Sequence, residues 1–165
     1  MKATSLLLLL CLWAASSHSD EVVPTALIRT DISYATLEFA VQGELRKAML
    51  TSGNRRIEIG GVIYERAGNF YPSTWLEGDE HSIPKFQFGM YRDTTIAAIW
   101  HTHPSPILAR SNGFSATDAK SAYGVRADAY VGVIVTDIIL RLRFEDIKRG
   151  EHNTFYSQDG EVTDL

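Results

Sequence analysis

Two histidines separated by one residue follow an apolar run in the sequence IAAIWHTHP. Side chains two positions apart in an extended chain point to the same side, so His101 and His103 are expected to project together from a strand end. Pro104 then ends the strand, because it has no N–H to donate to a neighbouring strand. The pair is either half of a metal site that needs further ligands or two structural histidines satisfied by hydrogen bonds.

A serine and an aspartate three positions apart follow, after a loop of residues 104–114. Ser115 and Asp118 have the spacing of a capping box at the start of a helix, which is the stronger interpretation of these residues alone. Taken with the two upstream imidazoles, the Asp118 carboxylate completes a three-ligand zinc site with a fourth position open for water, as in catalytic zinc. The helix N-terminus also offers N–H groups and a dipole that stabilise oxyanions.

The combined pattern resembles the JAMM (JAB or MPN+) zinc metalloproteases. It is more similar still to a bacterial secreted and toxin-associated branch, marked by a Glu-x-Gly-Gly strand, an HTHP segment and a Phe-Ser-x-x-Asp helix start. The three motifs stand here at Glu58–Gly61, His101–Pro104 and Phe114–Asp118, and the resemblance covers roughly residues 57–136. The loop of residues 104–114 is longer than is usual in JAMM proteins, which favours the bacterial branch over the deubiquitinase type.

The resemblance implies a role for each motif residue. His101, His103 and Asp118 bind Zn²⁺, which lowers the pKa of bound water to about 7 and polarises the scissile carbonyl. Glu58 is the general acid/base that moves the proton of this water to the leaving amine, and Ser115 positions the water and hydrogen-bonds the oxyanion. The implied activity is hydrolysis of amide or isopeptide bonds in a peptide, protein or peptidoglycan substrate. The alternatives are a catalytically inactive binding module and, for Glu58, a surface carboxylate.

Other residues with chemical potential have structural interpretations. The pair Gly60–Gly61 either lets a helix or a substrate backbone approach the strand closely or marks a β-bulge. His81 lies in the sequence EGDEH, which favours a solvated acidic loop over a ligand cluster. Trp75 and Trp100 are expected in the core rather than as platforms for substrate.

The hydrophobic periodicity predicts the elements that must position these residues. A helix is predicted over 25–50, or two helices broken near Gly43, with a stop over 51–54. A hairpin follows, with a strand over 57–64 and a return strand from Phe70, and then a surface loop over 72–93 that contains short strands. The remaining predicted elements are a strand over 94–103, a loop over 104–114, a helix over 115–123, strands over 129–135 and 138–144, and an optional last strand within 150–165. This order predicts an α/β (α+β) fold with a mixed central β-sheet and flanking helices. The resemblance implies a JAMM/MPN-like, cytidine-deaminase-like architecture, with substrate specificity set by residues 72–93 and 104–114.

The N-terminus has the features of a secretory signal peptide. Lys2 forms a short positive region, Leu6–Ala15 is apolar but too short to span a bilayer, and small residues surround a cleavage site after Ser19 or, alternatively, Ser17. An uncleaved anchor is the remaining alternative. We therefore expect a signal peptide over 1–19, a secreted or periplasmic bacterial protein, and no stable membrane span after cleavage.

Composition limits the number of domains and the classes of function that the rest of the chain can have. Its 165 residues, 45% of them hydrophobic, suit a single domain over 20–165. The net charge is −4 and no tract is rich in lysine or arginine, which argues against nucleic-acid binding. A zinc deaminase is discarded, because it requires a Cys-x-x-Cys pair and Cys11 is the one cysteine in the sequence.

Overall fold

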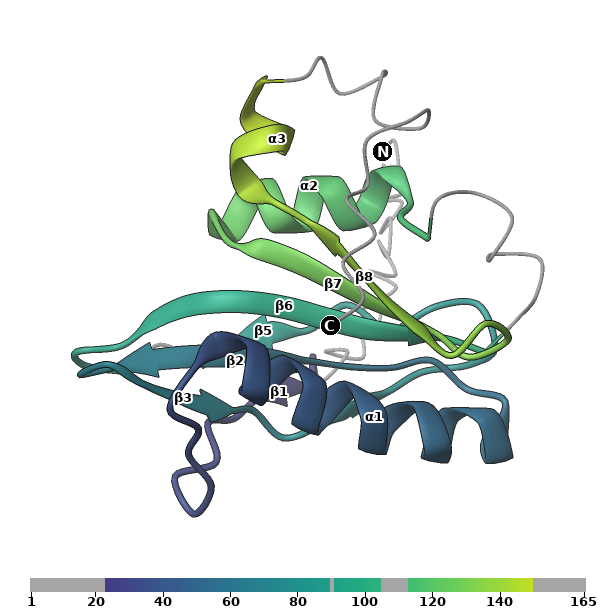
Figure 1. Ribbon diagram of the computed structural model, residues 1–165, viewed down its shortest axis with the longest axis horizontal. Coiled ribbons are helices and arrows are strands. Elements are labelled where there is room, and N and C mark those ends of the chain that lie inside the picture. The colour runs from purple at the N-terminus through teal and green to yellow at the C-terminus, as the bar shows by residue number, and fades with distance from the viewer. Residues whose placement is uncertain (1–22, 90, 105–112, 150–165) are drawn as a thin grey trace, which may run out of the picture.

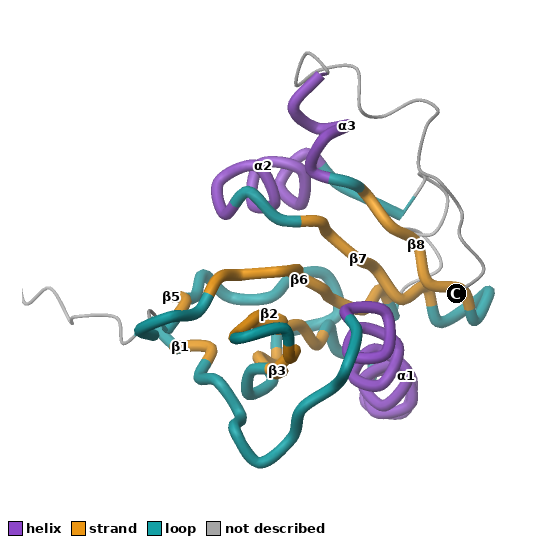
Figure 2. Tube along the Cα trace, turned by 60° about the vertical axis from the view of Figure 1, so that its left-hand side comes forward, coloured by secondary structure: helices purple, strands orange, loops and turns teal. Residues whose placement is uncertain are grey.

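The computed structural model describes residues 23–89, 91–104 and 113–149 as a mixed β-sheet with helices on both faces. The predicted signal peptide over 1–19 and the tail over 150–165 lie outside these residues. Helix α1 (Leu37–Arg55) covers one face, whereas α2 (Ala116–Val125) and α3 (Phe144–Arg149) cover the other (Figure 1). Figure 2 shows the sheet edge-on between these two layers. The predicted class, α+β with a mixed sheet, is confirmed.

The main sheet has six strands in the order β3-β2-β6-β7-β8, with β4 also paired to β2. The bounds are β2 Ile59–Arg66, β3 Asn69–Pro72, β4 Leu76–Glu77, β6 Thr95–His103, β7 Asp128–Val133 and β8 Ile138–Leu142. Strands β6 and β7 are parallel and every other pairing in this sheet is antiparallel. Helix α2 lies in the crossover between β6 and β7, and its first turn is close to the end of β6, since Asp118 Oδ1 lies 3.5 Å from His101 Nε2.

Helix α1 begins and ends later than the hydrophobic pattern predicted. Thr36 caps its N-terminus by accepting a hydrogen bond from the backbone N–H of Phe39 at 3.2 Å, and Arg56 ends it in a left-handed conformation. The predicted helix over residues 25–36 is wrong, because this segment pairs with strands that are distant in the sequence. Strand β1 (Thr25–Ala26) pairs in parallel with β5 (Gln87–Phe88).

Of the two alternatives at Gly43, a continuous helix is correct and a break is not; the stop predicted over 51–54 is wrong, since α1 is continuous to Arg55. Gly43 lets Tyr34 pack against α1, because a Cβ at this position would come within 2.8 Å of the Tyr34 hydroxyl unless that side chain shifted. The same hydroxyl donates to Glu44, which is fully buried and also accepts from the indole N–H of Trp75, both at 2.9 Å. These bonds fasten the segment before α1, and the loop after β3, to the helix.

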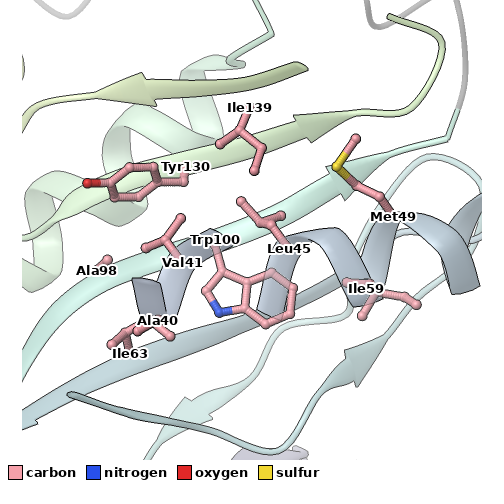
Figure 3. Packing of buried hydrophobic residues seen from close by; sticks show 11 residues of the cluster. Ala40, Val41, Leu45, Met49, Ile59, Ile63, Ala98, Trp100, Tyr130 and Ile139 are labelled. Atoms are coloured by element: carbon pink, nitrogen blue, oxygen red, sulfur yellow. The ribbon is translucent and has the colours of Figure 1, made fainter. Parts of the chain in front are cut away.

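The largest core cluster lies between α1 and the sheet (Figure 3). It combines aliphatic side chains of α1 with strand residues that include Trp100 and Tyr130. The next residues along these strands, Ile99 and Ala129, face α2 instead. Because side chains alternate along a strand, both faces of β6 and β7 are buried.

The C-terminal part of the described chain differs from the prediction. Strand β8 ends at Leu142, and Phe144 starts the helix α3 rather than extending the strand. The reason is Asp128, whose carboxylate accepts from the backbone N–H of Phe144 at 2.9 Å and from Arg141 at 2.7 Å. Among the residues that the structure describes, no helix combines the length and apolar character needed to span a membrane.

Candidate metal centre

The two histidines of the HTHP segment lie at the end of β6, on the face of the sheet that α2 covers. Their Nε2 atoms are 2.8 Å apart and their ring centroids 4.7 Å apart. His103 is 5% exposed, and the His101 side chain is 12% exposed. The predicted projection of both imidazoles to one side is therefore correct, and it follows from the alternation of side chains along a strand.

Asp118 meets this pair from the first turn of α2. Its Oδ1 atom lies 3.5 Å from His101 Nε2. Its Oδ2 atom accepts from the backbone N–H of Ser115 at 2.6 Å, while the Ser115 hydroxyl accepts from the Asp118 N–H at 3.2 Å. The capping box and the site at the histidines are therefore compatible, because they use different oxygens of one carboxylate.

The three residues fit a divalent metal ion. One donor atom from each of His101, His103 and Asp118 lies within 4.8 Å of the others. Donor atoms on a tetrahedral zinc ion are separated by about 3.3 Å, given metal–ligand bonds of about 2.0–2.2 Å. The separation of 3.5 Å between His101 and Asp118 matches this value, and the two imidazoles need to part by roughly 0.5 Å to accommodate the ion.

His103 is held in the form that binds metal. Burial, together with the positive charge that His101 would carry, lowers the pKa of His103 to about 4. Its imidazole is therefore neutral near pH 7, with an electron pair available for coordination. Its Nδ1 atom is buried and has no hydrogen-bond partner among the described residues.

Glu58 lies directly before β2 and is 5% exposed, so it is not a surface carboxylate. Its backbone is fixed by two hydrogen bonds, from its N–H to the Asp79 carbonyl at 2.6 Å and from the Gly78 N–H to its own carbonyl at 2.9 Å. Burial, together with the negative charges of Asp118 and Asp79, raises the pKa of Glu58 to about 8. A shift with these causes is typical of a catalytic carboxylate.

The candidate ligands and Glu58 line one cleft of about 790 Å³. Its walls are the loop from His81 to Phe88, the end of β6 and one side of α2. Ser115 also lines it, so all five predicted site residues border the same space. His81 is exposed and stands outside the three-residue ligand group, as the acidic-loop interpretation predicted.

The glycine pair allows a close approach of side chains within the protein. A Cβ on Gly60 would lie 2.4 Å from Ile83 Cδ1, and one on Gly61 would lie 2.7 Å from the Trp100 ring. The strand irregularity falls between Ile63 and Tyr64 rather than at the pair, so the β-bulge interpretation of the glycines is wrong. Their absent side chains leave room for the cleft loop on one face and a core indole on the other.

The predicted core role of the two tryptophans agrees with their packing. Trp100 is 2% exposed and Trp75 packs against the same cluster, with ring centroids 6.4 Å apart in an edge-on arrangement. Trp100 also forms part of the cleft wall.

Sequence reasoning missed a buried chain of hydroxyl groups behind the histidines. Thr102 Oγ1 accepts from the Ile59 N–H at 3.0 Å and donates to Ser52 Oγ at 2.9 Å. Ser52 in turn donates to the Ile57 carbonyl at 2.5 Å. Both hydroxyl residues are fully buried, and their contacts join α1 and β6 to the backbone on both sides of Glu58. The signal available in the sequence was a polar residue alternating with the two histidines.

No protein-family model matches the chain, and no curated protein matches it. Membership of the JAMM family therefore stays a prediction from the motif residues.

Proposed function

We propose that the protein is an exported, zinc-dependent hydrolase of amide or isopeptide bonds with a JAMM-like architecture. The observation that supports this most is the convergence of His101 Nε2, His103 Nε2 and Asp118 Oδ1 in a cleft that Glu58 also lines. A structural zinc site has four protein ligands, whereas three ligands beside an open cleft are the pattern of a catalytic one. The substrate would be a peptide, a protein or a peptidoglycan crosslink.

Zinc, when bound, supplies acidity to a water molecule and polarises the scissile carbonyl. Glu58 acts as the general base, accepting the proton of the attacking water, and then as the general acid, donating that proton to the leaving amine nitrogen. Burial and neighbouring carboxylates give it a high proton affinity, and a nearby dication would bring its pKa back toward the working range. The two backbone hydrogen bonds at Glu58 hold this residue at the cleft that it lines.

In this mechanism Ser115 stabilises the oxyanion. Its backbone N–H is occupied by Asp118, and its hydroxyl oxygen accepts from the Asp118 N–H. The hydroxyl proton remains to be donated toward the cleft, at a helix N-terminus whose dipole favours negative charge. Ser115 therefore both orients a metal ligand and offers a donor to the substrate.

The proposal is tested first by metal analysis of the purified chain. We expect one zinc per chain in the wild type and in Asp137→Ala, a control that removes a carboxylate whose side chain is 81% exposed. Asp118→Asn retains an oxygen that can cap the helix but is a weaker ligand, so it should fold normally and lose zinc. A wild-type protein that takes up no divalent metal would remove the mechanism.

Activity distinguishes the enzyme from a binding module. Zinc-loaded wild type is incubated with libraries of peptides, isopeptides and muropeptides, beside Glu58→Gln, which should keep the metal and lose at least about 100-fold in rate. If no library member is cleaved while His101→Ala still loses zinc, the protein is a binding module with a metal site.

A further inference from the structure

The cleft beside the ligand group contains two lysines that pair with no acidic residue in the described part of the chain. Lys85, on the loop before β5, and Lys120, on α2, both line the cleft and both are exposed. Most described arginines and lysines form ion pairs with carboxylates, and Arg66 lies 5.7 Å from the centre of the Tyr71 ring. Arg126 also forms neither kind of contact among the described residues, and it stands outside the cleft lining.

The negative groups of the cleft do not neutralise these lysines. Asp118 directs one oxygen at His101 and the other at the Ser115 N–H, and Glu58 is almost fully buried. Lys85 and Lys120 can therefore offer positive charge to a ligand in the open part of the cleft. This charge is opposite in sign to the net charge of −4 on the whole chain, which is how a protein with an acidic surface attracts an anion to one place.

The wall on which Lys85 stands is apolar. Ile83, Phe86 and Phe88 line the cleft beside it, and the two phenylalanine rings pack edge to face with centroids 5.1 Å apart. Ile99 of β6 extends this surface toward the histidines. Apolar pockets with a few polar groups at fixed places are typical of sites for small ligands and peptides.

We propose that the cleft binds an acidic peptide, with an apolar side chain against the Ile83–Phe88 wall and a carboxylate between Lys85 and Lys120. As a statement about substrate, this rests on the proposed hydrolase function; as a statement about binding, it does not require cleavage. The carboxylate is either the C-terminus of the peptide or an Asp or Glu side chain, and both present the same chemistry to the lysines.

The test measures binding by calorimetry to zinc-loaded Glu58→Gln protein, so that turnover does not remove the ligand. The first pair of probes is acetyl-Ala-Leu-Phe-Ala with a free carboxylate or with a C-terminal amide. The second pair is amidated acetyl-Ala-Leu-Phe-Glu-Ala and the same peptide with Gln. At low salt we expect the acidic member of at least one pair to bind about fivefold to tenfold more tightly, as two exposed ion pairs allow; which pair responds identifies the source of the carboxylate.

Variants then assign the effect. Lys85→Gln/Lys120→Gln should abolish the preference for the acidic peptide, whereas Arg126→Gln, which removes an equally exposed cation outside the cleft, should preserve it. The proposal would be overturned by equal affinity for acidic and neutral peptides, or by no measurable binding of either. It would also be overturned by a preference that survives the double substitution, or by one that is lost in the Arg126 control. If the wild type binds the acidic peptide but cleaves neither this peptide nor any member of the libraries, the hydrolase proposal fails while this one stands.

Discussion

At the scale of single residues, the site depends on carboxylates and imidazoles whose proton affinities are shifted by burial. Glu58 is pushed toward its neutral form, with its pKa raised to about 8, and His103 is pushed toward its neutral form, with its pKa lowered to about 4. A neutral His103 is ready to coordinate metal, and a carboxyl with high proton affinity is suited to proton transfer. Both pKa shifts make the folding stability depend on pH, and this dependence should be measurable in the metal-free protein.

The metal-free protein should lose stability between pH 6.5 and 8. Glu58 has a raised pKa, so the folded state holds its proton more tightly than the unfolded state, and this contribution is lost as pH rises from about 4.5 through about 8. His103 has a depressed pKa and contributes the opposite slope, but only between about 4 and 6.5. Between pH 6.5 and 8 the Glu58 effect is therefore larger than that of His103.

Urea unfolding in EDTA at pH 6.5 and pH 8 measures this loss. Glu58→Gln should flatten it and stabilise the protein at pH 8 by on the order of 2 kcal/mol, because it removes an unpaired buried charge. Glu38→Gln, at an exposed position, is the matched control and should keep the wild-type slope. A wild-type stability that does not fall between these two pH values would show that Glu58 ionises freely in the fold.

At the scale of elements, the site is held by contacts between segments far apart in the sequence. The histidines lie on strand β6, Asp118 lies in the first turn of α2, and Glu58 is the residue directly before β2. Thr102 joins two of these elements, since it lies between the histidines and bonds the backbone N–H next to Glu58. Its side chain points to the α1 face, opposite to the imidazoles, as alternation along a strand requires.

Thr102→Val should destabilise the protein by about 2 kcal/mol, because the isosteric side chain leaves the Ile59 N–H buried without an acceptor. Thr102→Ser keeps the hydroxyl and removes one methyl group, at a cost of about 1 kcal/mol. Chemical denaturation of both variants measures the difference. Zinc content should be unchanged in both, whereas kcat should fall in the valine variant and be restored in the serine variant. Equal stability of the two variants would mean that the hydroxyl chain does not hold the strands together.

At the scale of the whole molecule, the sheet separates a face that holds the main core from a face that carries the candidate ligand group. The α1 face carries the main core cluster and the buried hydroxyl chain, whereas the α2 face carries the ligand group and the cleft. The end of β6 and the start of α2 meet at the ligand group, where Asp118 Oδ1 lies 3.5 Å from His101 Nε2. A metal ion bound here would link the sheet to the helical layer above it.

Metal binding should therefore stabilise the whole fold. At free zinc about 1,000-fold above the dissociation constant, the gain is about 4 kcal/mol, which corresponds to a rise in Tm of roughly 10 °C for a domain of this size. Differential scanning fluorimetry with and without zinc measures it, and Asp118→Asn should show no rise. An equal rise in this variant would place the bound zinc elsewhere.

Local sequence patterns were sufficient for the parts of the site that are close in the chain. The alternation of His101 and His103 and the capping-box spacing of Ser115 and Asp118 are properties of a strand and a helix start, so they could be predicted without knowing the fold. The same patterns failed for residues 25–36, whose helical periodicity was overridden by pairing with distant strands.

The sequence alone determined the chemical types present and the local geometry at the end of β6 and the start of α2, because these depend on backbone periodicity over a few residues. The tertiary structure decided that the Asp118 oxygen faces the imidazoles, that Glu58 is buried beside them, and that Ser52 bonds a threonine fifty positions away. These facts depend on how the sheet and its two helical layers pack, and packing is a property of the whole chain rather than of any segment.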